Sequence, residues 1–124
     1  MLLDYYYTIK GQQTTGDTTL FYVSLINNCD IYNGHFPDMP VAPGVCNIQM
    51  IKECTERLTG KQLLLEYITQ CKLTTLITPQ QHPELEIRIQ ILEKDETQIK
   101  IKAVIGQDNS EYLTLRSCFE FYNK

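Results

Sequence analysis

Apolar and polar positions along the chain predict six strands and one long helix. Two runs rich in tyrosine, threonine and valine, residues 4–10 and 18–26, predict two strands joined by a turn, with Gly11 and Gly16-Asp17 between them. Four later segments also have strand character: residues 63–77, 85–92, 97–105 and 112–122. In the second of these, leucine and isoleucine alternate with charged and amide residues, which is the pattern of a half-buried strand.

Between the early and the late strands, residues 44–58 have the apolar repeat of an amphipathic helix. The apolar sector holds Ile48, Met50, Ile51, Cys54 and Leu58, and the opposite side holds Gln49, Lys52, Glu53, Glu56 and Arg57. Gly60 is suited to a left-handed cap that ends the helix. Asn47 falls in the apolar sector, either as a core polar group with a backbone partner or as a site residue.

The predicted elements describe one α+β domain over residues 1–124, in which an antiparallel sheet packs against one helix. Residues 27–43 are rich in Asn, Asp, Gly and Pro and are expected to form a loop. A loop of that length inside a compact domain is often functional.

Charge and cysteine content narrow the class of function. A net charge of −4 argues against nucleic acid as the main partner. Five scattered cysteines without a Cys-x-x-Cys pair are typical of free thiols in a reducing cytoplasm and argue against a zinc site. The first residues lack the pattern of a signal peptide, and no segment has the length of a membrane span. We therefore expect a cytoplasmic protein.

The proline-rich segment before the helix carries the most specific chemistry. Its sequence is Gly34-His35-Phe36-Pro37-Asp38-Met39-Pro40-Val41-Ala42-Pro43-Gly44-Val45. His35 titrates near neutral pH, and the prolines restrict the backbone that carries it. Gly44 opens the helix, where a backbone N–H points outward and the helix dipole favours negative charge. A base beside a polarising amide is what proton abstraction next to a carbonyl requires.

This segment resembles the signature of the β-hydroxyacyl-acyl carrier protein dehydratases of the FabA/FabZ type, roughly G-H-F-P-G-x-P-V-M-P-G-V. The chain departs from that signature at Asp38 and Ala42. The resemblance implies the hotdog fold, in which the sheet wraps around the helix, and loss of water from a thioester without a cofactor. It also implies that His35 is the base, that the Gly44 N–H polarises the carbonyl, and that Phe36 and Val45 contact the substrate.

The resemblance also points to two helix positions. The family acid lies fourteen residues after the histidine and is followed four residues later by a glutamine, whereas this chain has Gln49 and then Glu53. Gln49 can orient a hydroxyl or a water but cannot donate a proton as an acid does, and losing a general acid costs about 10²–10⁴-fold in rate. Glu53 either replaces the acid or forms an i,i+4 ion pair with Arg57.

Three functions stay open at this stage: an active dehydratase, a hotdog thioesterase in which Gln49 positions the hydrolytic water, and an incomplete subunit that a second hotdog chain completes. The resemblance implies a homodimer, because the family builds its site from two subunits, and acyl carrier protein as the partner that presents the substrate. The lysines and arginines that could dock this acidic carrier are Lys52, Arg57, Lys61, Lys100 and Lys102. His82 is expected to be a surface residue in a turn.

Overall fold

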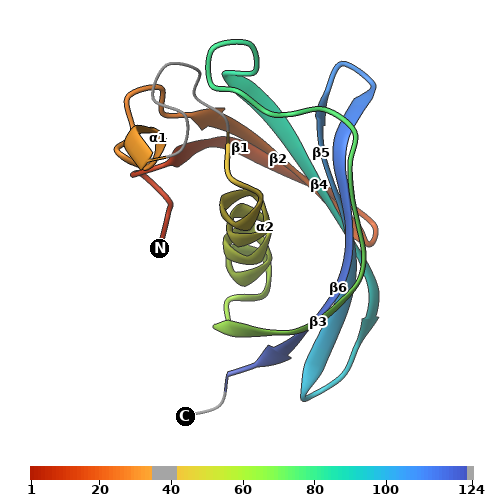
Figure 1. The fold of residues 1–124 in the computed structure, drawn as a ribbon. Coiled ribbons are helices and arrows are strands. Elements are labelled where there is room, and N and C mark those ends of the chain that lie inside the picture. The colour runs from red at the N-terminus through yellow and green to blue at the C-terminus, as the bar shows by residue number, and fades with distance from the viewer. Residues whose placement is uncertain (35–41, 123–124) are drawn as a thin grey trace.

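The computed structural model describes residues 1–34 and 42–122, which form one curved antiparallel sheet and two helices. The strands run in the order β1-β2-β4-β5-β6-β3. Their bounds are β1 Tyr7–Thr15, β2 Thr18–Leu25, β3 Leu63–Leu73, β4 Glu84–Lys94, β5 Gln98–Gln107 and β6 Ser110–Phe121. Figure 1 shows the sheet curving around the long helix α2 (Gly44–Thr59). The expected hotdog arrangement is confirmed.

Helix α2 fills the concave side of the sheet. Its side chains Met50, Ile51 and Cys54 are fully buried and belong to the same apolar cluster as the inward-facing strand residues. Gly60 adopts a left-handed conformation (φ 72°), and its N–H donates to the Glu56 carbonyl, so the predicted cap is confirmed. The core therefore fixes the rotation of α2 about its axis, and with it the direction of the polar side chains.

The first strand begins later than the sequence pattern predicts. Residues 2–6 form a turn in which the Tyr5 and Tyr6 N–H groups both donate to the Leu2 carbonyl, and β1 starts only at Tyr7. Gly11 lies inside β1 at a register shift, so the strand extends beyond its predicted end at residue 10 and the turn is shorter than predicted. The turn between β1 and β2 is at Gly16, whose φ of 62° suits glycine.

The predicted loop before α2 contains a short helix, α1 (Ile31–Gly34), which the irregular composition of the segment did not indicate. Tyr32 of α1 is buried against Tyr6, with 5.9 Å between the ring centroids. This contact joins α1 to the residues that precede β1. The chain then enters α2 through Ala42, whose N–H donates to the Ile77 carbonyl over 2.7 Å.

Strand β3 lies at the edge of the sheet and pairs with β6 alone among the described strands. Only its first residue, Leu63, is buried, and the large apolar side chains exposed along it are Leu64, Leu65, Tyr67, Ile68 and Leu73. The strand is also shorter than predicted, ending at Leu73 rather than near residue 77. A long edge strand with exposed apolar side chains is a template for pairing with another chain.

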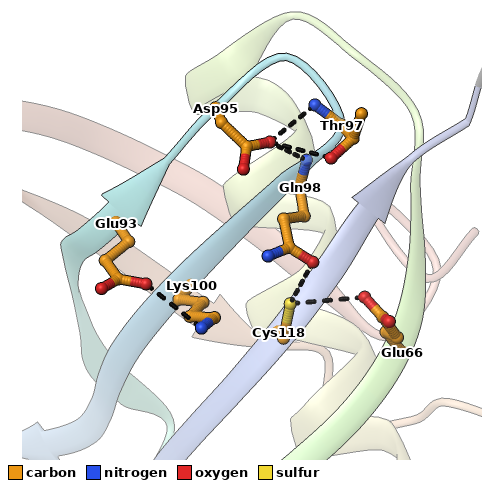
Figure 2. A network of polar contacts seen from close by, with 7 residues as sticks. All are labelled: Glu66, Glu93, Asp95, Thr97, Gln98, Lys100 and Cys118. Carbon is orange, nitrogen blue, oxygen red and sulfur yellow. Dashed lines mark hydrogen bonds and ion pairs between the residues drawn. The ribbon is translucent and has the colours of Figure 1, made fainter.

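The face of the sheet turned away from α2 carries a polar network, shown in Figure 2. Asp95 accepts from the N–H groups of Thr97 and Gln98, and these bonds hold the pKa of its carboxyl below the usual range. The Cys118 thiol lies 3.5 Å from both Gln98 Oε1 and Glu66 Oε2, so that side chains from β6, β5 and β3 meet there. The network connects the turn between β4 and β5 to the edge strand.

Candidate functional site

Of the residues that the sequence assigned to the site, Gly44, Val45, Gln49 and Glu53 can be placed. His35 and Phe36 lie outside the described residues, so their predicted roles stay predictions. The four placed residues all belong to α2 and follow its first three turns. The described part of the candidate site is therefore helical.

Gly44 is the first residue of α2 and is exposed. The Pro43 carbonyl accepts the N–H groups of Cys46 and Asn47, at 3.0 and 3.1 Å, and so closes the first turn. A Cβ atom added to Gly44 would meet nothing within 4 Å, so no neighbour among the described residues requires a glycine there. Val45 is 76% exposed and is free to contact a ligand.

Glu53 accepts four hydrogen bonds at the centre of the helix. Its Oε2 atom accepts from the Leu2 N–H (2.7 Å) and from Gln49 Nε2 (2.9 Å). Its Oε1 atom accepts from the Leu3 N–H (2.9 Å) and from the Tyr7 hydroxyl (3.1 Å). The carboxylate thus joins α2 to the N-terminal segment, residues 1–6, and to the start of β1.

The sequence pattern placed Glu53 on the polar side of α2, facing solvent, and this prediction is wrong. Glu53 is 6% exposed, because the N-terminal segment covers the side of the helix that the sequence pattern assigned to solvent. The alternative ion pair with Arg57 is not formed either, since the one ion pair within residues 1–34 and 42–122 joins Lys100 to Glu93. Buried carboxylates need hydrogen-bond donors, and here backbone amides far away in sequence supply them.

Tyr7 is the partner that sequence reasoning missed. Burial raises the pKa of its phenol, and the neighbouring Cys54 and Glu53 raise it further, so the hydroxyl stays protonated and donates to the carboxylate. Tyr7 was interpreted as an ordinary strand former. The only sequence signal for its role is a tyrosine at the start of a strand together with a glutamate on the helix.

The contact between Gln49 and Glu53 determines what Gln49 offers to a substrate. Its Nε2 atom donates to Glu53, and its carbonyl oxygen accepts no hydrogen bond from the described residues. Gln49 is half-buried, one helical turn before Glu53 and one turn after the opening of the helix. A hydrogen-bond acceptor at this position can bind a hydroxyl group or a water molecule.

A groove of about 360 Å³ continues from Glu53 toward the C-terminal end of α2. Met1, Leu3 and Ile9 form one wall, and the other wall includes Glu53 and Arg57 and ends at Lys61 beyond the helix. Its size is within the range of small-molecule sites. Within the described ranges, His, Cys, Asp and Glu side chains form no group of three that could hold a metal ion.

Two further residues that the sequence singled out can be placed. Asn47, for which the sequence left a core role and a site role open, is buried, and its Oδ1 atom has no hydrogen-bond partner within the described part of the chain. His82 is half-buried rather than on the surface: its Nδ1 atom accepts the Thr78 N–H over 3.1 Å, and its ring lies 4.8 Å from that of Tyr112. His82 therefore stabilises a turn.

Comparisons with known proteins agree with this fold. The model of the ApeI-like family, described as ApeI dehydratase, matches residues 11–112. The dehydratase FabZ of Halalkalibacterium halodurans, which acts on 3-hydroxyacyl-acyl carrier protein, is 32% identical over 69 residues, which are 50% of this chain and 49% of that protein. The chain spans about half the length of the curated relatives it matches.

Two solved structures share the fold. A chain of the dehydratase heterocomplex ApeI:P from Xenorhabdus doucetiae superposes with a TM-score of 0.70 at 16% identity, covering 90% of this chain and 96% of that one. A hypothetical thioesterase of Streptococcus pneumoniae, solved with coenzyme A, superposes with a TM-score of 0.66 at 9% identity, covering 95% and 87%.

No helix in the described parts of the chain is both long enough and apolar enough to cross a membrane. The family match covers most of the chain, including the His35 motif, the whole of α2 and four complete strands. The protein therefore belongs to the ApeI-like dehydratases, a family of FabA/FabZ-like hotdog proteins.

Proposed function

We propose that this protein removes water from β-hydroxyacyl thioesters carried by acyl carrier protein and produces trans-2-enoyl thioesters. The observation that carries the proposal is the family match, because it spans both the His35 motif and helix α2. His35 takes the α-proton as the base. The Gly44 N–H donates to the thioester carbonyl, where negative charge develops, and the N-terminal end of α2 stabilises that charge. The reaction needs no cofactor.

Gln49 orients the β-hydroxyl group of the substrate in this proposal. Its carbonyl oxygen accepts a hydrogen bond from that hydroxyl group, while its amide nitrogen donates to Glu53. Glu53 acts as a positioning residue rather than as the proton donor, because four donors already occupy its carboxylate. Phe36 and Val45 line the acyl side of the site, and Val45 is exposed enough to do so.

An acid for the departing hydroxyl is then missing from the helix of this chain. A homodimer can still react if His35 returns the proton it has taken, at a lower rate than with a dedicated acid. A heterodimer with a second hotdog chain restores the acid where that chain carries a carboxylic acid at the position of Gln49. The occupied Glu53 carboxylate favours this second candidate, a subunit of a heteromeric dehydratase.

Strand β3 supports assembly with a second hotdog chain, either a copy of this chain or a different one. Its outer edge has no strand beside it in the described structure, and it exposes Leu64, Tyr67 and Ile68. Pairing of this edge with a second β3 extends the sheet and covers these side chains. We expect Ile68→Lys to convert a dimer into a monomer in light scattering, while Tyr22→Lys, at an exposed site on β2, leaves the mass unchanged. A wild-type monomer at micromolar concentration would contradict the dimer.

One experiment separates the candidate functions. Purified protein is incubated with β-hydroxyacyl-acyl carrier protein, and the products are identified by mass spectrometry. Enoyl product that is lost in His35→Ala supports the dehydratase. Release of free acid supports a thioesterase, in which the Gln49 oxygen positions the water. Enoyl product that forms only after a second hotdog protein is added supports the heteromeric subunit. No product in any of these mixtures refutes the proposal.

A further inference from the structure

We infer that the groove beside α2 binds the phosphopantetheine arm of the substrate, with Arg57 and Lys61 holding its phosphate. The inference rests on the proposed function, because that function places the thioester at Gln49. The groove starts at Glu53, whose carboxylate contacts Gln49, and it ends at Arg57 and Lys61. Its opposite wall is apolar and comes from Met1, Leu3 and Ile9.

The length of the groove suits this ligand. Gln49 and Arg57 are eight residues apart on α2, a separation of about 12 Å at about 1.5 Å per residue. Lys61 follows the Gly60 cap and lines the same end of the groove. The arm has about thirteen bonds from its sulfur to its phosphorus, which span about 16 Å at about 1.2 Å per bond when extended. A sulfur atom at Gln49 therefore places the phosphate between Arg57 and Lys61.

The charges at the far end of the groove favour an anion. Arg57 is exposed and forms no ion pair within the described ranges, and Lys61 places its Nζ atom 4.7 Å from the ring centroid of Phe121. The two acidic groups of the groove are already bonded: Glu53 to its four donors, and Glu56 to the Leu63 N–H over 2.9 Å. The carbonyl end of α2 disfavours an anion weakly, and the two cations outweigh it.

The distribution of apolar and charged groups along the arm matches their distribution along the groove. A phosphopantetheine arm has a flexible chain of apolar segments and amides, followed by a phosphate that carries the only charge. The groove correspondingly has an apolar wall along its length and cations at one end only. An ordinary fatty acyl chain would leave Arg57 and Lys61 without an anion, which is why we assign the groove to the arm.

The test compares three thioesters of one β-hydroxyacyl group, carried by pantetheine, by 4′-phosphopantetheine and by acyl carrier protein. The variant is Arg57→Ala/Lys61→Ala. We expect kcat/KM to fall about tenfold for the two phosphorylated substrates, mainly through KM, and to stay unchanged for the pantetheine thioester. Lys10→Ala/Arg88→Ala removes the same charge outside the groove and is expected to change none of the three values.

A titration with free 4′-phosphopantetheine tests the groove without turnover. We expect the Kd to rise about tenfold in Arg57→Ala/Lys61→Ala and to stay constant in the control variant. An unchanged Kd, or an equal loss in both variants, overturns the inference. So does a loss confined to the carrier-protein substrate, because the two cations would then contact the carrier rather than the phosphate. If wild-type protein converts no thioester, the proposed function fails, while the titration still decides the inference about the groove.

Discussion

Replacing Glu53 by alanine tests whether its carboxylate holds the N-terminal segment on α2. The substitution removes an acceptor from four donors, two of them backbone N–H groups. A hydrogen bond to a charged group contributes about 1.5–3 kcal/mol net. The four bonds share one carboxylate, and water can reach the two partly buried N–H groups in the variant. We therefore expect a loss of about 4 kcal/mol in the free energy of unfolding, a large part of the 5–15 kcal/mol typical of a domain.

Thermal and urea denaturation followed by circular dichroism measure this loss, at one fixed protein concentration because assembly also affects stability. For a domain of this size, about 4 kcal/mol lowers Tm by roughly 15 °C. Glu53→Gln keeps one acceptor oxygen and is expected to lose about half as much. Glu56→Ala is the matched control, because among the described residues the Glu56 carboxylate accepts only the Leu63 N–H, and losing that one bond costs about 1.5 kcal/mol.

Hydrogen exchange identifies which part of the molecule responds. In Glu53→Ala, the Leu2 and Leu3 amides are expected to exchange freely, while amides in the centre of β5 stay protected. A Tm for Glu53→Ala within about 2 °C of wild type would refute the assigned role. Equal losses in Glu53→Ala and Glu56→Ala would also refute it, because one bond and four bonds would then contribute the same.

Three further variants test the site and its surroundings. Gly44→Ala is expected to keep the wild-type Tm, because a Cβ atom there meets nothing within 4 Å. It is expected to lower turnover about tenfold or more, because the added methyl group crowds the substrate carbonyl. A fall in Tm together with the fall in turnover would indicate that Gly44 has a packing role. Gln49→Glu places two carboxyl groups about 3 Å apart, where they share one proton. We expect the rate of dehydration to rise about tenfold or more in a product assay, because this proton can be donated to the departing hydroxyl. An unchanged rate would contradict the role assigned to Gln49. Burial raises the pKa of Cys54 from 9.0 to about 12, so the unfolded chain loses this proton at a lower pH than the folded chain. The free energy of unfolding therefore falls as the pH rises from 9 toward 12, by up to about 1.4 kcal/mol per pH unit. Urea denaturation of Cys54→Ala at pH 8 and pH 10.5 should show a smaller alkaline loss than wild type.

Local patterns in the sequence were sufficient for much of the fold. The bounds of α2 and its Gly60 cap follow from the apolar repeat and from the preference of glycine for positive φ. The alternation in residues 85–92 correctly predicted the buried side chains Leu85, Ile87 and Ile89 of β4. These features depend on neighbours a few residues apart, which a pattern can register.

Features that depend on distant contacts were missed or assigned incorrectly. The helix pattern placed Glu53 with the charged residues, but it contains no information about the amides of residues 2 and 3, which are 50 or more positions away. The first strand was predicted to end before Gly11, whereas this glycine lies at an irregularity within β1, which continues to Thr15. The resemblance directed attention to Gln49 and Glu53, but only the hydrogen bonds assign them different roles.

The hydrogen bonds between Glu53 and residues 2 and 3 affect how a mutational scan would be interpreted. The helix carboxylate binds backbone N–H groups there, so most side-chain replacements at Leu2 and Leu3 preserve the bonds to it. An alanine scan would therefore report the packing of these two side chains and miss the hydrogen bonds, while proline at either position, which has no N–H, would remove a bond. Deleting the first residues, or crowding them with a fused tag, would disturb the helix that bears Gln49.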